Sequence, residues 1–117
     1  MKKIILTGIA TAALAFSASA EVKVGNPMAV TGPIPDLVAP MVSAVDLAAQ
    51  HVNEQGGLFS DGQKYTIVRA DSGCDPTAAV DAVTKLVNVE QVSAIIGPVC
   101  SGATIAQAQS VTIPAGV

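Results

Sequence analysis

The chain has 117 residues and is 50% hydrophobic, 3% aromatic and 13% charged, with a formal net charge of −3. This composition is that of a globular protein, not a disordered one, and the abundant Ala and Val residues suit close packing of helices on a sheet. An acidic chain without a basic cluster excludes nucleic acid and anionic membrane surfaces from the expected partners.

Residues 1–20 have the pattern of an export signal. Lys2 and Lys3 precede an apolar run from Ile4 to Phe16, and Ala18-Ser19-Ala20 forms a signal-peptidase site ahead of Glu21. The run is shorter than the roughly 20 residues that span a bilayer, which disfavours a membrane anchor. We therefore expect a cleaved signal peptide, export of the mature chain and no membrane span. Without Lys2 and Lys3, four of the six basic residues remain against nine acidic ones, a net charge of −5.

The domain that follows is predicted to start with a strand and a helix. Residues 22–30 form an extended apolar segment that ends at the turn Thr31-Gly32-Pro33. Apolar residues then recur at helical spacing as far as Gly56-Gly57, a pair typical of a left-handed C-cap. Because proline fits only the first turn of a helix, we expect the helix to start near Pro40, with Leu37 just ahead of it.

A second strand and helix are predicted after a surface turn at residues 58–62. Residues 65–70 have the pattern of a strand. Asp75 is a favourable N-cap and Pro76 a favourable first helical residue, so a helix begins there. The expected buried stripe of this helix consists of Ala79, Val80, Val83, Leu86 and Val87.

The third unit is predicted from residue 92 onward. Residues 92–96 are short and apolar, as in a strand that is covered on both faces. Ser101 is expected to cap a third helix that runs to about Ser110, and Ile113 and Val117 are expected to start a fourth strand. Val117 would then fall inside a strand with an open edge, so we expect a truncated sequence; a complete small secreted domain is the alternative.

Strands that alternate with helices predict right-handed βαβ units, and hence an α/β fold with a doubly wound parallel sheet in three α/β/α layers. Such a sheet binds ligands beyond the carboxyl ends of its strands, where the strand order reverses. The loops after the first and third strands, residues 29–37 and 97–102, are therefore the candidate site. The second of these loops leads into a helix, so its backbone N–H groups and the Ser101 hydroxyl would face a small anion.

Cys74 and Cys100 are the only cysteines. In an exported chain they favour one disulfide, which would stabilise the fold by roughly 3–4 kcal/mol in the chain-entropy model. A metal site needs more ligands than these cysteines and the distant His51, and a cysteine nucleophile needs a histidine beside it. We therefore expect no metal, no cofactor and no catalytic cysteine.

Four short stretches in the order found here resemble the N-terminal part of the periplasmic leucine/isoleucine/valine-binding protein family. They are Thr31-Gly32-Pro33, VNEQGG at 52–57, DSGCDP at 71–76 and IGPVCS at 96–101. That family supplies the substrate-binding components of branched-chain amino acid ABC transporters, with the type I periplasmic-binding-protein fold. The resemblance implies that residues 21–117 are the N-terminal part of lobe one of a two-lobe ligand-binding domain.

The resemblance also implies roles for individual residues. Ser101 would bind the ligand's α-carboxylate together with backbone N–H groups of the loop that contains Cys100 and Gly102, and Val99 would line the same pocket. Leu37 stands where these proteins often carry an aromatic residue over the ligand side chain, which puts leucine-like specificity in doubt. The implied partners are a small amino acid or amide and an inner-membrane ABC permease, and the full-length protein is expected to be a monomer.

Two other functions remain open on the sequence alone. A receptor or regulator domain of the same fold would bind an amide, urea or an aromatic acid. A secreted hydrolase would need a nucleophile elbow of the G-x-S-x-G kind, and residues 97–102 lack that spacing. We therefore expect a binding protein that is not an enzyme.

Overall fold

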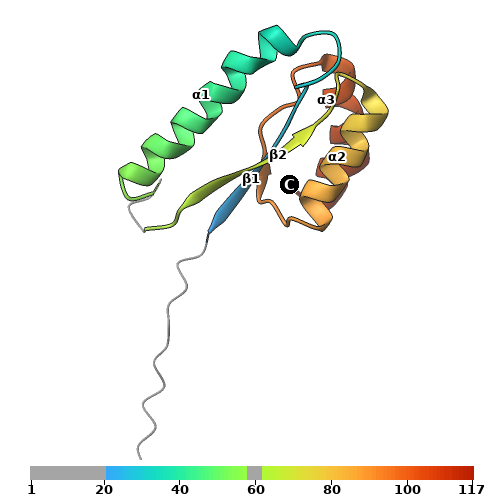
Figure 1. Cartoon of the computed structure of the whole chain (residues 1–117). Coiled ribbons are helices and arrows are strands. Elements are labelled where there is room, and N and C mark those ends of the chain that lie inside the picture. The colour runs from blue at the N-terminus through green and yellow to red at the C-terminus, as the bar shows by residue number, and fades with distance from the viewer. Residues whose placement is uncertain (1–20, 58–61) are drawn as a thin grey trace, which may run out of the picture.

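The structure is a computed structural model that describes residues 21–57 and 62–117. The expected signal peptide and most of the turn at 58–62 lie outside the described residues. The elements, in chain order, are β1 (Val22–Met28), α1 (Pro35–Glu54), β2 (Tyr65–Asp71), α2 (Pro76–Asn88), β3 (Ala94–Ile95), α3 (Ser101–Gln107), the π-helix η1 (Ala108–Thr112) and α4 (Ile113–Ala115) (Figure 1).

The three strands form one parallel sheet in the order β2-β1-β3. Val22 pairs with Tyr65 at one end of β1 and Met28 pairs with Asp71 at the other, while Val24 pairs with Ala94 of β3. Helix α1 covers one face of the sheet, and α2 and α3 cover the other (Figure 1). This arrangement confirms the doubly wound fold, and it places the loops after β1 and β3 side by side where the strand order reverses.

Part of the core lies on the face of the sheet that α2 covers. Leu86 and Val83 of α2 are 2% and 0% exposed. Gly25 of β1 makes room for them, because a Cβ atom there would lie 2.6 Å from Ile95 Cδ1 and 3.1 Å from Leu86 Cδ1. Burying a side chain the size of Leu86 contributes about 1.5–3 kcal/mol, so this contact holds α2 on the sheet.

Helix α1 begins five residues earlier than the sequence predicts, at Pro35 instead of near Pro40. Ile34 is its N-cap, and the Ile34 carbonyl accepts hydrogen bonds from the backbone N–H groups of Leu37 and Val38. Leu37 therefore lies inside the helix. Pro40 leaves one helical carbonyl without its usual donor, and the complete burial of Val38 against the sheet offsets that loss.

The predicted ends of α1 and start of α2 are confirmed. Gly56 and Gly57 have φ angles of 89° and 93°, and the Gly57 N–H donates to the Val52 carbonyl at 3.0 Å. Asp75 caps α2 by accepting a hydrogen bond from the Ala78 N–H at 2.8 Å. Both signals are local in the sequence, which is why they could be read from it.

The third strand and the C-terminal segment differ from the prediction. β3 has only two residues, and Ala94 and Ile96 are exposed, so this strand is not covered on both faces. The predicted fourth strand is wrong, because the chain stays helical from Ser101 to Ala115 and ends that helix at left-handed Gly116.

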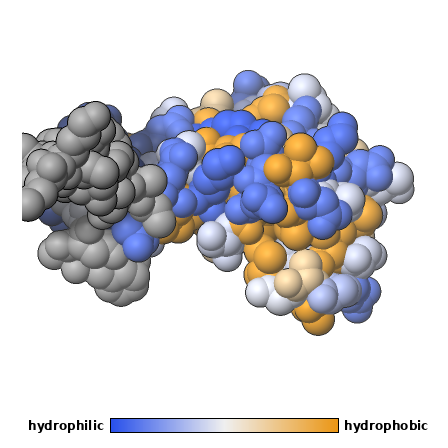
Figure 2. All heavy atoms as spheres, turned by 90° about the horizontal axis from the view of Figure 1, so that it is seen from below, coloured by the Kyte–Doolittle hydropathy of each residue, from blue (hydrophilic) through white to orange (hydrophobic). Residues whose placement is uncertain are grey.

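Figure 2 shows hydrophobic side chains gathered on part of the molecular surface, beside a more hydrophilic area.

The π-helix has a local cause in the sequence. Pro114 has no N–H to donate to Ser110, and just before it the Ile113 N–H donates to the Ala108 carbonyl, five residues back. Val111 and Thr112 are buried at this point and pack the segment against the rest of the protein.

Within residues 21–57 and 62–117, no helix combines the length and the apolar character needed to cross a bilayer.

Candidate ligand-binding site at the carboxyl edge of the sheet

The disulfide predicted from the sequence is present. Cys74 and Cys100 are bonded, with their Cα atoms 5.4 Å apart. Cys74 has a φ of 60°, so the loop after β2 turns sharply to reach its partner. The bond ties this loop to the one that follows β3, and thereby fixes the residues just ahead of Ser101.

A second clasp joins the loops after β1 and β2. One carboxylate oxygen of Asp71 accepts hydrogen bonds from the backbone N–H groups of Val30, Thr31 and Gly73, and the other accepts one from the Thr31 hydroxyl at 2.5 Å. Burial alone would raise the pKa of Asp71, but the hydrogen bonds from Thr31, Gly73 and Val30 outweigh it and hold the pKa below its ordinary value. Asp71 is therefore a structural carboxylate and no acid–base catalyst.

The turn Thr31-Gly32-Pro33 has a geometric reason for its glycine. Gly32 has a φ of 91°, and a Cβ atom there would lie 2.3 Å from the Gly73 carbonyl oxygen. Any other residue would clash with the backbone of the neighbouring loop as well as strain its own. The motif and the Asp71 clasp thus serve the same close contact between the loops after β1 and β2.

A small hydrophobic cluster lies beneath these loops. Met28, Ala29 and Val38 are buried in it, and partly buried residues pack against them: Ile34, Val42, Cys74, Val99 and Cys100. The cluster therefore joins the end of β1, the first turns of α1 and the loop after β3. Val99 and Cys100 belong to this packing, so any contact that they make with a ligand uses the part of each residue left exposed.

The start of α3 is less closed than the sequence predicts. Cys100, not Ser101, is the N-cap residue, and its side chain makes no capping hydrogen bond. Ser101 is the first helical residue, and both Ser101 and Gly102 are exposed. Thr104 is the first residue whose N–H donates within the helix, to the Cys100 carbonyl at 2.9 Å.

Several donors at this point have no protein acceptor in the described part of the chain. No hydrogen bond there uses the Ser101 hydroxyl or the backbone N–H groups of Ser101, Gly102 and Ala103. The Thr104 hydroxyl, by contrast, donates to the Pro98 carbonyl at 2.8 Å and so braces the loop from behind. Unpaired N–H groups at a helix start bind anions, and carboxylates are among the anions that fit.

Leu37 lies on the other side of the candidate site. Its side chain is 55% exposed, in the first turn of α1. A hollow of about 370 Å³ lies beside it, lined by Val30, Pro35, Asp36, Ala39 and Val42. A larger hollow of about 490 Å³ lies between β2 and α2, on the far side of the Asp71 clasp, and it does not include Ser101. The loops at the carboxyl edge thus form an open surface and not a closed pocket.

Metal and nucleophile chemistry find little support at this edge. His51 is in the last turn of α1, where its ring bonds to Gln55 at 2.8 Å, far along the helix from buried Val38. Among residues 21–57 and 62–117, no three His, Cys, Asp or Glu side chains come together as they would around a metal ion. The arrangement can hold an anion and an apolar group, and both are noncovalent tasks.

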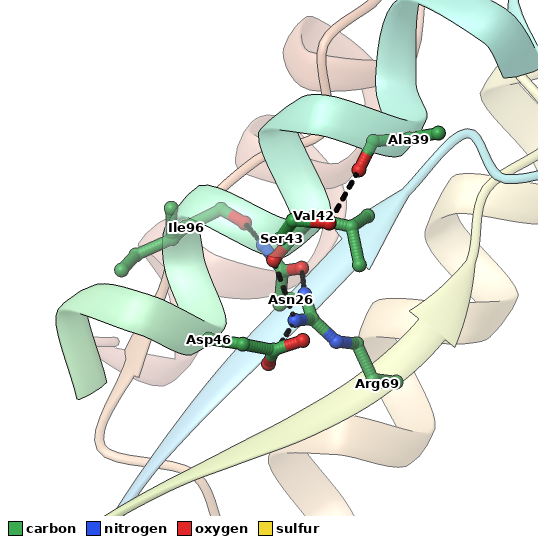
Figure 3. Close-up of polar contacts among 7 residues, drawn as sticks. All are labelled: Asn26, Ala39, Val42, Ser43, Asp46, Arg69 and Ile96. Carbon is green, nitrogen blue, oxygen red and sulfur yellow. Dashed lines mark hydrogen bonds and ion pairs between the residues drawn. The ribbon is translucent and has the colours of Figure 1, made fainter. Parts of the chain in front are cut away.

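One group of polar residues near the site was missed at the sequence level. Arg69 of β2, Asn26 of β1 and Asp46 of α1 form a connected set of hydrogen bonds between α1 and the sheet (Figure 3). An asparagine inside a strand and an arginine inside the next strand along the chain were the signals available. Its partners are far apart in the sequence, so the connection itself could not be read.

Comparison with known proteins gives one family. Residues 21–113 match the family model described as periplasmic binding protein. The chain is 33% identical over 106 residues to the Leu/Ile/Val-binding protein homolog 7 of Brucella abortus, which covers 91% of this chain and 26% of that protein. It is 35% identical over 95 residues to the Leu/Ile/Val-binding protein of Escherichia coli, covering 79% of this chain and 25% of that protein.

Solved structures agree. The branched-chain amino acid transporter substrate-binding protein LivJ from Streptococcus pneumoniae, in complex with isoleucine, superposes with a TM-score of 0.77 at 30% identity, over 84% of this chain and 27% of that one. A solute-binding protein of an ABC transporter from R. palustris, in complex with benzoate, superposes with a TM-score of 0.66 at 27% identity, over 77% of this chain and 24% of that one. The chain thus spans about a quarter of the relatives that it matches.

Proposed function

Because the chain belongs to the periplasmic binding protein family, we propose that it supplies the carboxylate-binding part of a solute-binding protein for an ABC transporter. The observation that carries this proposal is the start of α3. There the Ser101 hydroxyl and three successive backbone N–H groups lack protein acceptors within the described residues, and the disulfide holds the loop in place. Donors that are fixed but unpaired are what an anionic ligand group requires.

The ligand class follows from what two related proteins hold. Isoleucine and benzoate, bound to LivJ and to the R. palustris protein, have a carboxylate in common and little else. A site whose constant part binds a carboxylate and whose variable part selects the remainder would accommodate both. We therefore propose a small carboxylic acid as the ligand, with branched-chain or related amino acids as the first class to test.

Each residue of the proposed site has a separate task. Ser101 donates its hydroxyl and its backbone N–H to the carboxylate. Other backbone N–H groups of the loop that contains Cys100 and Gly102 complete that contact. Val99 contributes the exposed part of its side chain to the pocket wall. Leu37, exposed at the start of α1, covers the ligand's side chain. An aliphatic residue there leaves more room than an aromatic one and disfavours a stacked leucine-like side chain.

The proposed mechanism is reversible closure of two lobes on the ligand, followed by delivery to an inner-membrane permease. This chain forms part of lobe one, and the remaining contacts come from the three quarters of the relatives' length that it does not span. We propose a periplasmic location after signal cleavage at residue 20 and a monomer at full length, with no covalent step. A sensing domain of the same fold would use the same contacts and differ in its partner.

A chimera tests the proposal. The chain replaces the matched quarter of the Escherichia coli Leu/Ile/Val-binding protein, and isothermal titration measures its affinity for isoleucine, benzoate and isoleucinamide. We expect binding of an acid but not of the amide, because the amide removes the carboxylate. Ser101→Ala should weaken the binding by roughly tenfold or more, the effect of one hydrogen bond to a charged group. The matched control is Ser110→Ala, an exposed serine of η1, which should leave affinity unchanged.

Two results would contradict the proposal. One is a chimera that binds isoleucinamide as tightly as isoleucine, and the other is a Ser101→Ala variant that keeps the parent affinity. The 117-residue chain by itself should bind no amino acid at micromolar concentration, since most of the pocket belongs to parts of the relatives that it does not span.

A further inference from the structure

The side chain of Arg69 lies between the sheet and α1 and bonds to three groups. Its guanidinium donates to the Asn26 side-chain oxygen, to the carbonyl oxygen of Val42 at 3.0 Å and to the carboxylate of Asp46. Figure 3 shows this guanidinium pointing from β2 toward Asn26 and α1. One side chain thus bonds to two consecutive turns of α1 and to the central strand.

Asn26 continues the chain of hydrogen bonds in the other direction. It is fully buried, and its side-chain NH2 group donates to the Ile96 carbonyl at 2.6 Å. The Ile96 N–H in turn donates to the Gly25 carbonyl at 2.9 Å, so the polar groups of Ile96 are fixed on both sides by β1. Figure 3 shows Asn26 between Ile96 and Arg69.

Ile96 is the last residue before the candidate binding loop. Gly97 follows with a φ of 116°, and a Cβ atom there would lie 3.1 Å from the Met28 Sδ atom, so the chain turns sharply under tight packing. A small rotation of the Ile96 carbonyl would therefore move the whole turn that leads to Ser101. The Asn26 amide is the side chain that holds this carbonyl.

We propose that Asn26 and Arg69 are positioning residues: they orient the loop 97–102 relative to α1 without touching the ligand. The two sides of the proposed site, Leu37 on α1 and Ser101 on α3, are then held at a fixed separation by one polar connection that is buried at Asn26 and partly exposed at Arg69. Its importance for binding rests on the proposed function, whereas the connection itself does not.

The cost of the arrangement argues that it has a specific role. The buried amide loses its hydration and the partly exposed guanidinium loses some of its own, and an apolar pair at these two positions would avoid that loss. The neighbours on the same face of β1, Val24 and Met28, are apolar and buried. What an apolar pair would lack is a directional bond to the Ile96 carbonyl, and buried polar groups are best explained by such directional constraints.

Hydrogen exchange of the 117-residue chain tests this connection without any ligand. Asn26→Asp keeps the size of the side chain and its acceptor for Arg69, but it removes the NH2 donor to Ile96. We expect the two hydrogen-bonded amides that flank the loop, those of Ile96 and Thr104, to exchange about tenfold faster, as for the loss of one hydrogen bond in a local opening. Amides of Val83 and Leu86 in the core of α2 should keep their parent rates.

The chain provides a matched control at the other end of α1. The Asn53 side chain donates to the Tyr65 carbonyl at 2.8 Å and accepts from the Tyr65 N–H at 2.7 Å, so Asn53→Asp removes the same kind of donor. This control should speed exchange near Tyr65 and leave the amides of Ile96 and Thr104 unchanged. Equal acceleration of these two amides in both variants would mean general destabilisation and would overturn the proposal.

A second variant covers the case in which Asn26→Asp does not fold. Arg69→Lys keeps the positive charge but cannot bond to Asn26 and α1 at once, so the amides of Ile96 and Thr104 should again exchange faster, by a smaller factor. Unchanged rates at these two amides, for either folded variant, would overturn the proposal. A chimera that bound no ligand would contradict the proposed function and leave this result as it stands.

Discussion

The starts of α2 and α3 lie at the same edge of the sheet and are joined by the disulfide, yet they differ in how they are capped. At α2, Asp75 accepts a hydrogen bond from the Ala78 N–H, and Pro76 has no N–H to satisfy. At α3, no side chain caps the helix, and Ser101 is exposed inside its first turn. The first helix start has a side-chain acceptor for one of its donors, whereas the second, within the described residues, has none.

The two helix starts also differ in the charged residues around them. The loop before α2 contains Asp71 and Asp75, whereas residues 91–117 contain no Asp, Glu, Lys, Arg or His. An anion that approaches the start of α3 therefore meets no carboxylate from this segment, and the helix dipole favours it. The comparison indicates that a helix start that departs from ordinary capping is the place to look for function.

Breaking the link between the two helix starts should have the largest effect on stability. Reduction, or the double change Cys74→Ser and Cys100→Ser, should lower the free energy of unfolding by roughly 3–4 kcal/mol, because the unfolded chain regains the entropy of an open loop. Urea unfolding with and without reductant measures this, with mass analysis of alkylated thiols as the control. Two freely alkylated thiols in the unreduced exported chain would contradict the account.

The two helix starts should respond differently to removal of their polar side chains. Asp75→Ala should lower the free energy of unfolding by about 1 kcal/mol, because an N–H of α2 loses its acceptor. Ser101→Ala should change it by less than about 0.5 kcal/mol, since that hydroxyl caps nothing. Urea unfolding of the two variants gives the comparison directly. Equal losses would show that Ser101 is a capping residue and not one left free for a ligand.

The smallest expected effect concerns the loop before α2 and its dependence on pH. The pKa of Asp71 is lowered in the folded chain, so its stabilising contribution is fully present above the ordinary Asp pKa and is lost as pH falls through the folded value. The carboxylate is partly exposed, so we expect less than about 1 kcal/mol. Urea midpoints at several pH values should fall less steeply in acid for Asp71→Asn than for the parent. Identical acid profiles would exclude the clasp as a source of stability.

The difference between the two helix starts also separates what could and could not be predicted from the sequence. Asp75-Pro76 is a local signal, and it placed α2 correctly. The disulfide was accessible because two cysteines allow one pairing. Ser101 was misassigned as a cap because a serine before a helical segment usually is one. The prediction of a fourth strand was wrong. The residues near Ile113 favour a strand by type, but the segment stays helical, and Val111 is buried in that helix.

Other features depend on contacts that no local pattern contains. The early start of α1 depends on the burial of Val38 in a cluster that joins the end of β1, the first turns of α1 and the loops that carry Cys74 and Cys100. The Asp71 clasp joins residues 40 and 41 positions apart, and Asn26 reaches Ile96 across 70 positions. The composition and the order of the elements fix the fold class, but the shape of the site depends on these distant pairs.

The central claim is that the start of α3 binds the carboxylate of the ligand. Amide chemical shifts of the chimera with the Escherichia coli protein, measured by NMR during titration, test it most directly. Isoleucine should shift the N–H signals of residues 101–103 more than those of residues 76–78 at the start of α2, and isoleucinamide should shift neither group. Equal shifts with acid and amide, or unmoved signals at residues 101–103 in the isoleucine complex, would contradict the account.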